Sequence, residues 1–138
     1  MNTRRSILIL ITCLTGPSVR AAEDGPVDFV KQIKPIISER CIECHNSENL
    51  LGNVNLQNRE HAMQKRKQEP VIVPNEPDKS EFYLTLKLPP IERKAMPATA
   101  HRLPKDDIEM IRQWIVEGAI WPMGKDGEIT PRKYRQND

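Results

Sequence analysis

The chain of 138 residues carries 21 lysine and arginine residues against 19 aspartate and glutamate residues, giving a net charge of +2. This length predicts a single domain, and the near balance of charge argues against a nucleic-acid-binding protein, which would show a strong basic bias. Aromatic residues make up only 4% of the sequence. The polypeptide alone therefore offers a small core, to which a bound apolar group would add the missing mass.

The first 21 residues predict a cleavable export signal. Arg4 and Arg5 form a basic start, residues 6–14 form an apolar run, and small residues follow at Ala21. The run is shorter than the about 20 residues that a membrane-spanning helix needs, and the pattern is typical of a secretory signal peptide. We therefore expect residues 1–21 to be removed, the mature chain to have no transmembrane segment, and the protein to be periplasmic or otherwise exported.

The segment after the leader predicts a helix that runs into a cysteine pair. Asp28 is placed to cap the start of this helix. Apolar side chains recur at helical spacing along one face, at Phe29, Ile33, Ile36, Ile37 and Cys41. Pro35 lacks a backbone N–H, so we expect the helix to kink or split near residues 31–34.

The stretch Cys41–His45, of sequence CIECH, has the spacing of a c-type haem attachment site. Each thiol can add across one haem vinyl group. Cys41 and Cys44 lie about one helical turn apart, so both sulfurs can reach one edge of a porphyrin. His45 follows at once and can bind the iron as the proximal ligand.

Other uses of this cysteine pair fit the sequence less well. A zinc site needs four ligands, usually from a second Cys or His pair, and His61 and His101 lie far apart in the chain. A thioredoxin-like redox motif would need a βαβ context, which is not evident. The third cysteine, Cys13, is expected to leave with the leader. The motif therefore favours haem, with a disulfide, half a zinc site and a thiol-disulfide centre as alternatives.

The elements between the motif and residue 88 are expected to be short. Turn-forming residues predict a loop over residues 45–52, after which Asn58 is placed to cap a helix reaching about Lys65. Asp78 and Glu81 have the spacing of a capping box. They predict a second helix through about Leu88.

Residues 91–102 show no helical or strand periodicity. An irregular segment in a small domain is often functional, and this one is expected to cover the open face of the haem. It contains Met96, whose thioether is the predicted second iron ligand. Pro97 restricts Met96 to an extended backbone. His101, five residues on, is the rival ligand and would give a bis-histidine haem.

The clearest predicted helix covers Lys105–Glu117. Ile108, Ile111 and Ile115 form its apolar stripe, and Gly118 is a natural stop. We expect Trp121 to fold back onto the core. From Gly124 onward the chain is polar and is expected to fray.

With these elements placed, the chain resembles class I cytochrome c and, more closely, the planctomycete-type cytochrome c domain. Besides the CIECH motif, four stretches carry the resemblance: Val27–Ile37, Val73–Ser80, Ala95–Pro97 and Ile108–Pro122. The resemblance implies a small all-α, cytochrome c-like domain over residues 22–123, with N- and C-terminal helices packed around one covalent haem c. A polar C-terminal tail would cover residues 124–138. One departure is Ala98, where the family usually has a second proline.

The function implied is electron transfer by an exported mono-haem cytochrome, without catalysis on a substrate. Cys41 and Cys44 would hold the haem, and His45 and Met96 would ligate its iron. Its partners would be redox proteins that dock through a small, transient interface, and not nucleic acid. The alternatives are a haem-based enzyme or gas sensor, which needs an open iron position, and a non-haem thiol-disulfide protein.

Overall fold

The computed structural model describes residues 25–65 and 70–133. The predicted leader, residues 1–21, lies outside them. Within this part of the chain the structure is helical and contains no strand, which is compatible with the expected all-α class. The elements in chain order are η1 (Phe29–Ile33), α1 (Lys34–Arg40), η2 (Leu51–Asn53), α2 (Arg59–Ala62), η3 (Pro77–Lys79), α3 (Glu81–Lys87), α4 (Lys105–Val116) and η4 (Gly124–Asp126).

The helix that leads to the cysteine pair is split, as Pro35 predicts. Asp28 caps η1, because its carboxylate accepts a hydrogen bond from the N–H of Lys31 at 3.0 Å. η1 is a π-helix in which the N–H of Lys34 donates to the carbonyl of Phe29. Pro35 then lies in the first turn of α1, where its missing N–H costs least. The wider π turn lets the chain pass the proline without losing its direction.

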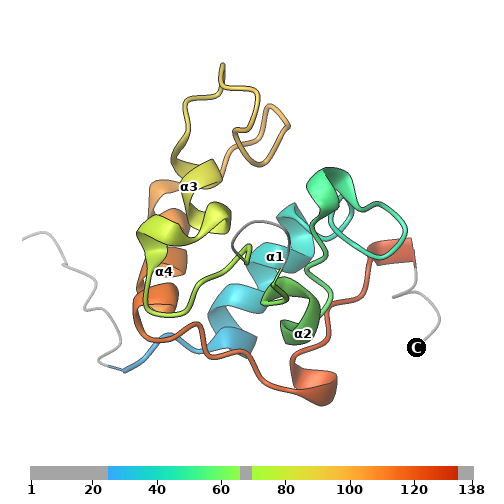
Figure 1. Cartoon of the computed structure of the whole chain (residues 1–138), viewed down its shortest axis with the longest axis vertical. Coiled ribbons are helices and arrows are strands. Elements are labelled where there is room, and N and C mark those ends of the chain that lie inside the picture. Colours follow the sequence, from blue (N-terminus) through green and yellow to red (C-terminus); the bar gives the residue numbers. More distant parts are fainter. Residues whose placement is uncertain (1–24, 66–69, 134–138) are drawn as a thin grey trace, which may run out of the picture.

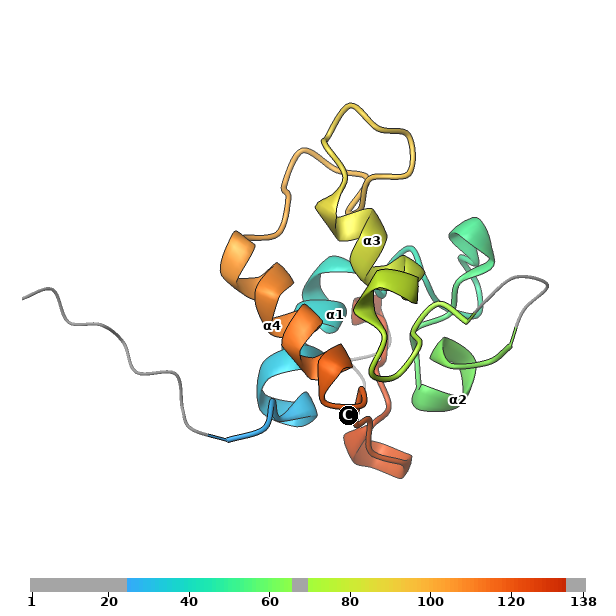
Figure 2. The same cartoon turned by 60° about the vertical axis from the view of Figure 1, so that its left-hand side comes forward.

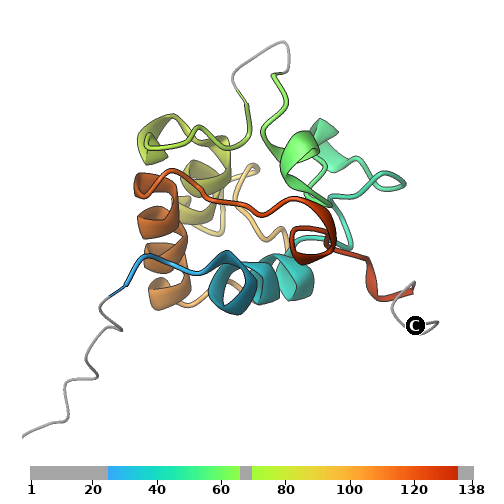
Figure 3. The ribbon, with the colours of Figure 1, turned by 90° about the horizontal axis from the view of Figure 1, so that it is seen from below.

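The α4 helix packs against both η1 and α3. Figures 1 and 2 show α3 and α1 beside α4, with the long loop that joins α3 to α4 projecting beyond the ends of both helices. Seen from below in Figure 3, the segment after α4 crosses the molecule toward the side that carries α2. None of the helices in the described ranges is long and apolar enough to cross a membrane.

Three aromatic rings form the centre of the core. The Phe29 ring centroid lies 4.5 Å from that of Trp121 and 5.8 Å from that of Trp114. Both indole N–H groups are satisfied, with Trp114 donating to the carbonyl of Ile120 at 3.0 Å and Trp121 to that of Gly127 at 2.7 Å. Trp121 is only 3% exposed, which confirms that it folds back onto the core.

The expectation that the chain frays after Gly124 is wrong for residues 124–133. Ile129 is 2% exposed, and its N–H donates to the carbonyl of Gln57 at 2.7 Å. The N–H of Arg132 donates to the carboxylate of Glu43 at 2.7 Å. This segment therefore runs back along the middle of the chain and covers part of the core. Residues 134–138 lie outside the described residues.

One helix start and one helix end differ from the expected ones. α2 is capped by Asn58 as expected but ends at Ala62. The predicted capping box at Asp78 is wrong, because α3 begins at Glu81, after the separate turn η3. Ser80 does not cap α3 either: its hydroxyl contacts backbone groups of Val73 and the carbonyl of Glu76. The buried serine thus ties the chain before α3 to the preceding turn.

The C-terminal helix confirms the prediction to within one residue. α4 covers Lys105–Val116, with Ile111 and Ile115 fully buried. Gly118 has a φ of +98°, the left-handed conformation that favours glycine after a helix.

Gly127 is expected to tolerate no side chain. A Cβ at this position would lie 1.8 Å from the carbonyl oxygen of Pro122, which is backbone and cannot rotate away. We expect Gly127→Ala to lower the free energy of unfolding by about 3 kcal/mol or more, at or above the upper end of typical overpacking costs. Urea denaturation followed by circular dichroism measures this loss.

Gly25→Ala is the matched control, because a Cβ there would meet nothing within 4 Å. Equal unfolding midpoints for the two variants would contradict the predicted clash.

Candidate haem site

The cysteine pair lies in a tight turn directly after α1. The N–H of Cys44 and that of His45 both donate to the carbonyl of Cys41, at 3.2 and 3.1 Å. Ile42, inside the turn, is fully buried. Burial of the Ile42 side chain in the core fixes the position of the turn. The side chains of the neighbouring residues therefore have fixed directions.

The Asn46 side chain stabilises this turn through hydrogen bonds to its backbone. The sequence analysis did not identify this role. It is 2% exposed, and its amide donates to the carbonyls of Ile42 at 2.7 Å and Glu43 at 3.2 Å. Its side-chain oxygen accepts the N–H groups of Glu48 and Asn49 at 2.9 and 3.0 Å. Sequence analysis treated Asn46 as one of several turn formers, since a buried asparagine has no periodic signature.

His45 is oriented by a backbone carbonyl. Its Nδ1 lies 3.0 Å from the carbonyl oxygen of Leu51. A carbonyl can only accept, so Nδ1 carries the proton and Nε2 keeps the lone pair that a metal needs. Burial lowers the pKa of His45, and hydrogen bonds with backbone groups of Leu51 and Val54 offset part of this effect. The site therefore favours the neutral imidazole, which is the ligating form.

A cavity beside this turn brings together residues from distant parts of the chain. The empty space in and around it amounts to about 500 Å³, part of which is open to solvent. Its lining combines the end of α1, the loop before α2, α3 and the loop after α3. The lining residues are Arg40, Cys41, His45, Val54, Leu56, Val71, Glu81, Phe82, Thr85, Leu86, Met96 and Pro97.

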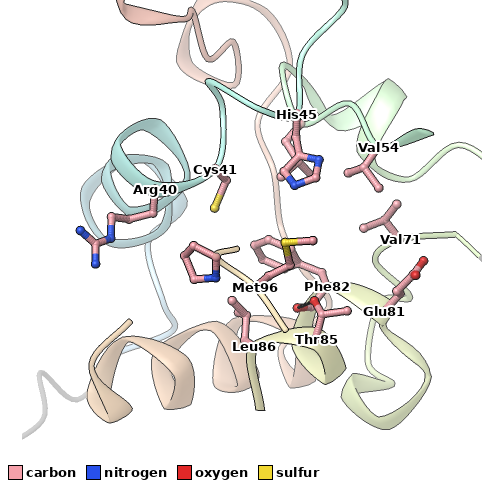
Figure 4. A pocket seen from close by; sticks show the side chains of 12 residues that line it. Arg40, Cys41, His45, Val54, Val71, Glu81, Phe82, Thr85, Leu86 and Met96 are labelled. Carbon is pink, nitrogen blue, oxygen red and sulfur yellow. Dashed lines mark hydrogen bonds between the residues drawn. The ribbon is translucent and has the colours of Figure 1, made fainter. Parts of the chain in front are cut away.

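Three of the four predicted haem-binding residues line this cavity. Figure 4 shows the Cys41 sulfur and the His45 ring pointing into it, with the Met96 sulfur reaching in from another side. The N–H of Met96 donates to the carbonyl of Thr85 at 3.0 Å, which ties the methionine to α3. Cys44, the fourth residue, is exposed and is not part of the lining. The rival ligand His101 is also exposed and does not line the cavity.

The Cys41 thiol has an environment unlike that of a reactive thiol. Burial raises its pKa to about 12, the charge of Arg40 acts in the opposite direction, and Cys44 adds a small further increase. The two cysteines are not joined to each other. Thiol-disulfide enzymes need a lowered pKa at the attacking cysteine. The surroundings of Cys41 therefore argue against the thiol-disulfide alternative.

The residues around the cavity fit a haem. Apolar side chains form much of the wall, at Val54, Leu56, Val71, Phe82 and Leu86. An imidazole and a thioether face the same space, and this is the His/Met donor pair found in cytochromes c. Among the described residues, no three His, Cys, Asp or Glu side chains gather in a way that could hold another metal ion.

Comparison with protein families found a match over the middle of the chain. Residues 41–97 match the family model described as Planctomycete cytochrome C. The match begins at the first cysteine of the motif and ends just after Met96, so it spans all four predicted haem-binding residues. The comparisons with curated proteins and with solved structures each found no significant match.

Residues 41–97 of the chain are therefore similar to cytochrome c, and this similarity supports a c-type cytochrome. Within that class, the matched segment is of the planctomycete type, which confirms the resemblance seen in the sequence.

Removal of the Asn46 amide should weaken the turn that presents His45. We expect Asn46→Ala to lower the free energy of unfolding by roughly 2–4 kcal/mol, because it leaves buried carbonyl and N–H groups without partners. Asn49→Ala is the control, since that side chain is exposed and donates one hydrogen bond, to the carbonyl of Glu43. Chemical denaturation of the two variants gives the comparison, and a loss no larger in Asn46→Ala would contradict the assigned role.

Proposed function

We propose that this protein is an exported mono-haem c-type cytochrome that transfers electrons through iron ligated by His45 and Met96. The observation that carries the proposal is the apolar cavity lined by Cys41, His45 and Met96. These residues come from the turn after α1 and from the loop after α3, which lie about 50 residues apart in the chain.

The chain's own residues would hold the haem in three ways. Each thiol of Cys41 and Cys44 would add across one vinyl group, with sulfur bonding to one vinyl carbon and a hydrogen going to the other. His45 would bind iron through Nε2, because Nδ1 is engaged by Leu51. Met96 would bind through its sulfur. When bound, the haem supplies the one-electron chemistry.

The donor set and the cavity would both influence the reduction potential. A thioether is a soft ligand, and His/Met ligation raises the potential relative to bis-histidine ligation. The apolar wall formed by residues such as Val71 and Phe82 would reduce the contact of the haem with water, which disfavours the more highly charged ferric state. Both effects favour a relatively high potential, as suits an electron carrier.

An electron carrier, and not a haem enzyme, is the function that this arrangement favours. A haem-based enzyme or gas sensor needs an open iron position. The presence of Met96 in the same cavity as His45 disfavours such a position. With two ligands held by the protein, iron can change oxidation state with little rearrangement. Partners would be redox proteins that meet the haem edge through a small, transient interface.

The predicted leader supports export of the protein from the cytoplasm. Residues 1–21 would direct secretion and be removed. Covalent attachment of haem to c-type cytochromes follows export of the unfolded chain, so the leader and the CIECH motif agree.

Covalent attachment is tested by mass. The intact mass of the mature protein should exceed that of the polypeptide by one haem, because two thioether bonds survive denaturation. Haem should also remain with the protein in acidic acetone, and a Cys41→Ala, Cys44→Ala double variant should lose it completely. Full extraction of haem from the unaltered protein would refute attachment.

The identity of the second ligand is tested by paired substitutions. Met96→Ala should become high-spin or bind carbon monoxide readily, and its weak near-infrared sulfur-to-iron band should vanish. His101→Ala should keep the original spectrum, because His101 is exposed and outside the cavity. The opposite result, in which Met96→Ala stays low-spin and His101→Ala does not, would assign the ligand to His101.

A further inference from the structure

The loop that carries Met96 has little core of its own. Residues 88–104 contain no helix, and the loop projects beyond α3 and α4 in both side views (Figures 1 and 2). Only Ala95, Pro97 and Leu103 are buried in it. Residues 90–102 surround about 740 Å³ of empty space, part of it open to solvent. Apolar packing therefore does little to fix this loop, and polar contacts must hold much of it.

Arg102 supplies several of these contacts. Its guanidinium donates to the carbonyl of Pro97 at 3.0 Å, directly after Met96. It also donates to the carbonyls of Leu86 at 3.2 Å and Leu88 at 3.0 Å, at the end of α3. Carbonyls in the last turn of a helix have no partner within the helix. One side chain thus joins the residue after Met96 to the end of the helix that forms the cavity wall.

Arg40 ties the same loop to the haem-attachment turn. It precedes Cys41 in sequence, and its guanidinium donates to the carbonyls of His101 and Arg102, both at 3.1 Å. Figure 4 shows this guanidinium directed away from the cavity. The backbone carbonyl of Arg102 therefore accepts a hydrogen bond from Arg40, while its own side chain donates one to Pro97.

We propose that Arg102 is a positioning residue for Met96, fixing the loop so that the thioether stays at the iron. The inference rests on the proposed His/Met ligation. It adds the residue that determines how often the methionine dissociates from the iron. A guanidinium has five N–H donors in a planar fork and can serve three carbonyls at once. An ammonium is a compact point donor and cannot span the same set.

The test compares variants of the haem-loaded protein. Arg102→Gln removes the fork and its charge, and Arg102→Lys keeps the charge alone. Arg93→Gln is the matched control. Arg93 is an exposed arginine of the same loop, with no hydrogen bond or ion pair to any described residue.

The first readout is the rate at which the ferrous protein binds carbon monoxide, since the methionine must leave the iron first. We expect Arg102→Gln to raise this rate at least about tenfold, because a hydrogen bond from a charged donor is worth about a factor of ten or more in such an equilibrium. Arg102→Lys should give an intermediate increase, and Arg93→Gln should match the unaltered protein.

The second readout is hydrogen–deuterium exchange at the Met96 amide, which is bonded to the carbonyl of Thr85. In Arg102→Gln this amide should exchange faster by a factor similar to that for carbon monoxide, while amides of α4 are unchanged. If both sets of amides speed up equally, the residue acts only on global stability and the proposal is overturned.

Failure of the inference and failure of the proposed function give different results. If the unaltered protein shows the sulfur-to-iron band and both Arg102 variants behave like Arg93→Gln, only the role of Arg102 is overturned. If the unaltered protein lacks that band and Met96→Ala leaves its spectrum unchanged, His/Met ligation is overturned and the role of Arg102 with it. Should Arg102→Gln yield no haem-loaded protein, unaltered carbon monoxide binding in Arg102→Lys would still overturn the proposal.

Discussion

The contact of the Phe29 ring with the two indoles of Trp114 and Trp121 joins the three parts of the chain that the rest of the fold needs. Phe29 starts the helical segment that ends at Cys41, Trp114 lies in α4, and Trp121 lies in the segment that returns over the core. Aromatic pairs at such distances contribute about 0.5–1.5 kcal/mol each beyond the area they bury. Because η1 and α1 continue directly from Phe29, this cluster also sets where the CIECH turn lies.

Around the cavity, polar side chains donate hydrogen bonds to backbone carbonyls, and the atoms predicted to bind iron face apolar walls. Asn46, His45 and Arg102 each donate to carbonyl oxygens. Their donors are thereby satisfied away from the cavity, and the imidazole Nε2 keeps its lone pair. Burial raises the pKa of Cys41 and lowers that of His45. Both shifts favour neutral groups, as a space meant for a largely apolar porphyrin requires.

The sequence predicts the parts of this structure that depend on periodicity or on a short motif. The stripe of α4, the split at Pro35 and the cap at Asp28 are confirmed because each depends on neighbours within one or two turns. The burial of Ile129 was not predicted, because a single apolar residue in a polar segment shows no periodic spacing of apolar residues. Arg102 was missed for a related reason: its three partners are backbone carbonyls, which every residue type supplies. The roles of Ile129 and Arg102 can therefore be recognised only in the folded structure.

The two predicted ligands differ in how the chain fixes them. The bond that orients His45 spans six residues, and the turn around it closes within the motif. The bonds that hold the Met96 loop span 16 residues from Arg102 to Leu86 and 61 from Arg40 to His101. Local openings of a protein begin where buried apolar contacts are few, and in the Met96 loop only Ala95, Pro97 and Leu103 are buried. The methionine side is therefore expected to open at a lower free energy than the histidine side. In the proposed ligation, His45 would be the permanent ligand and Met96 the one that dissociates more readily.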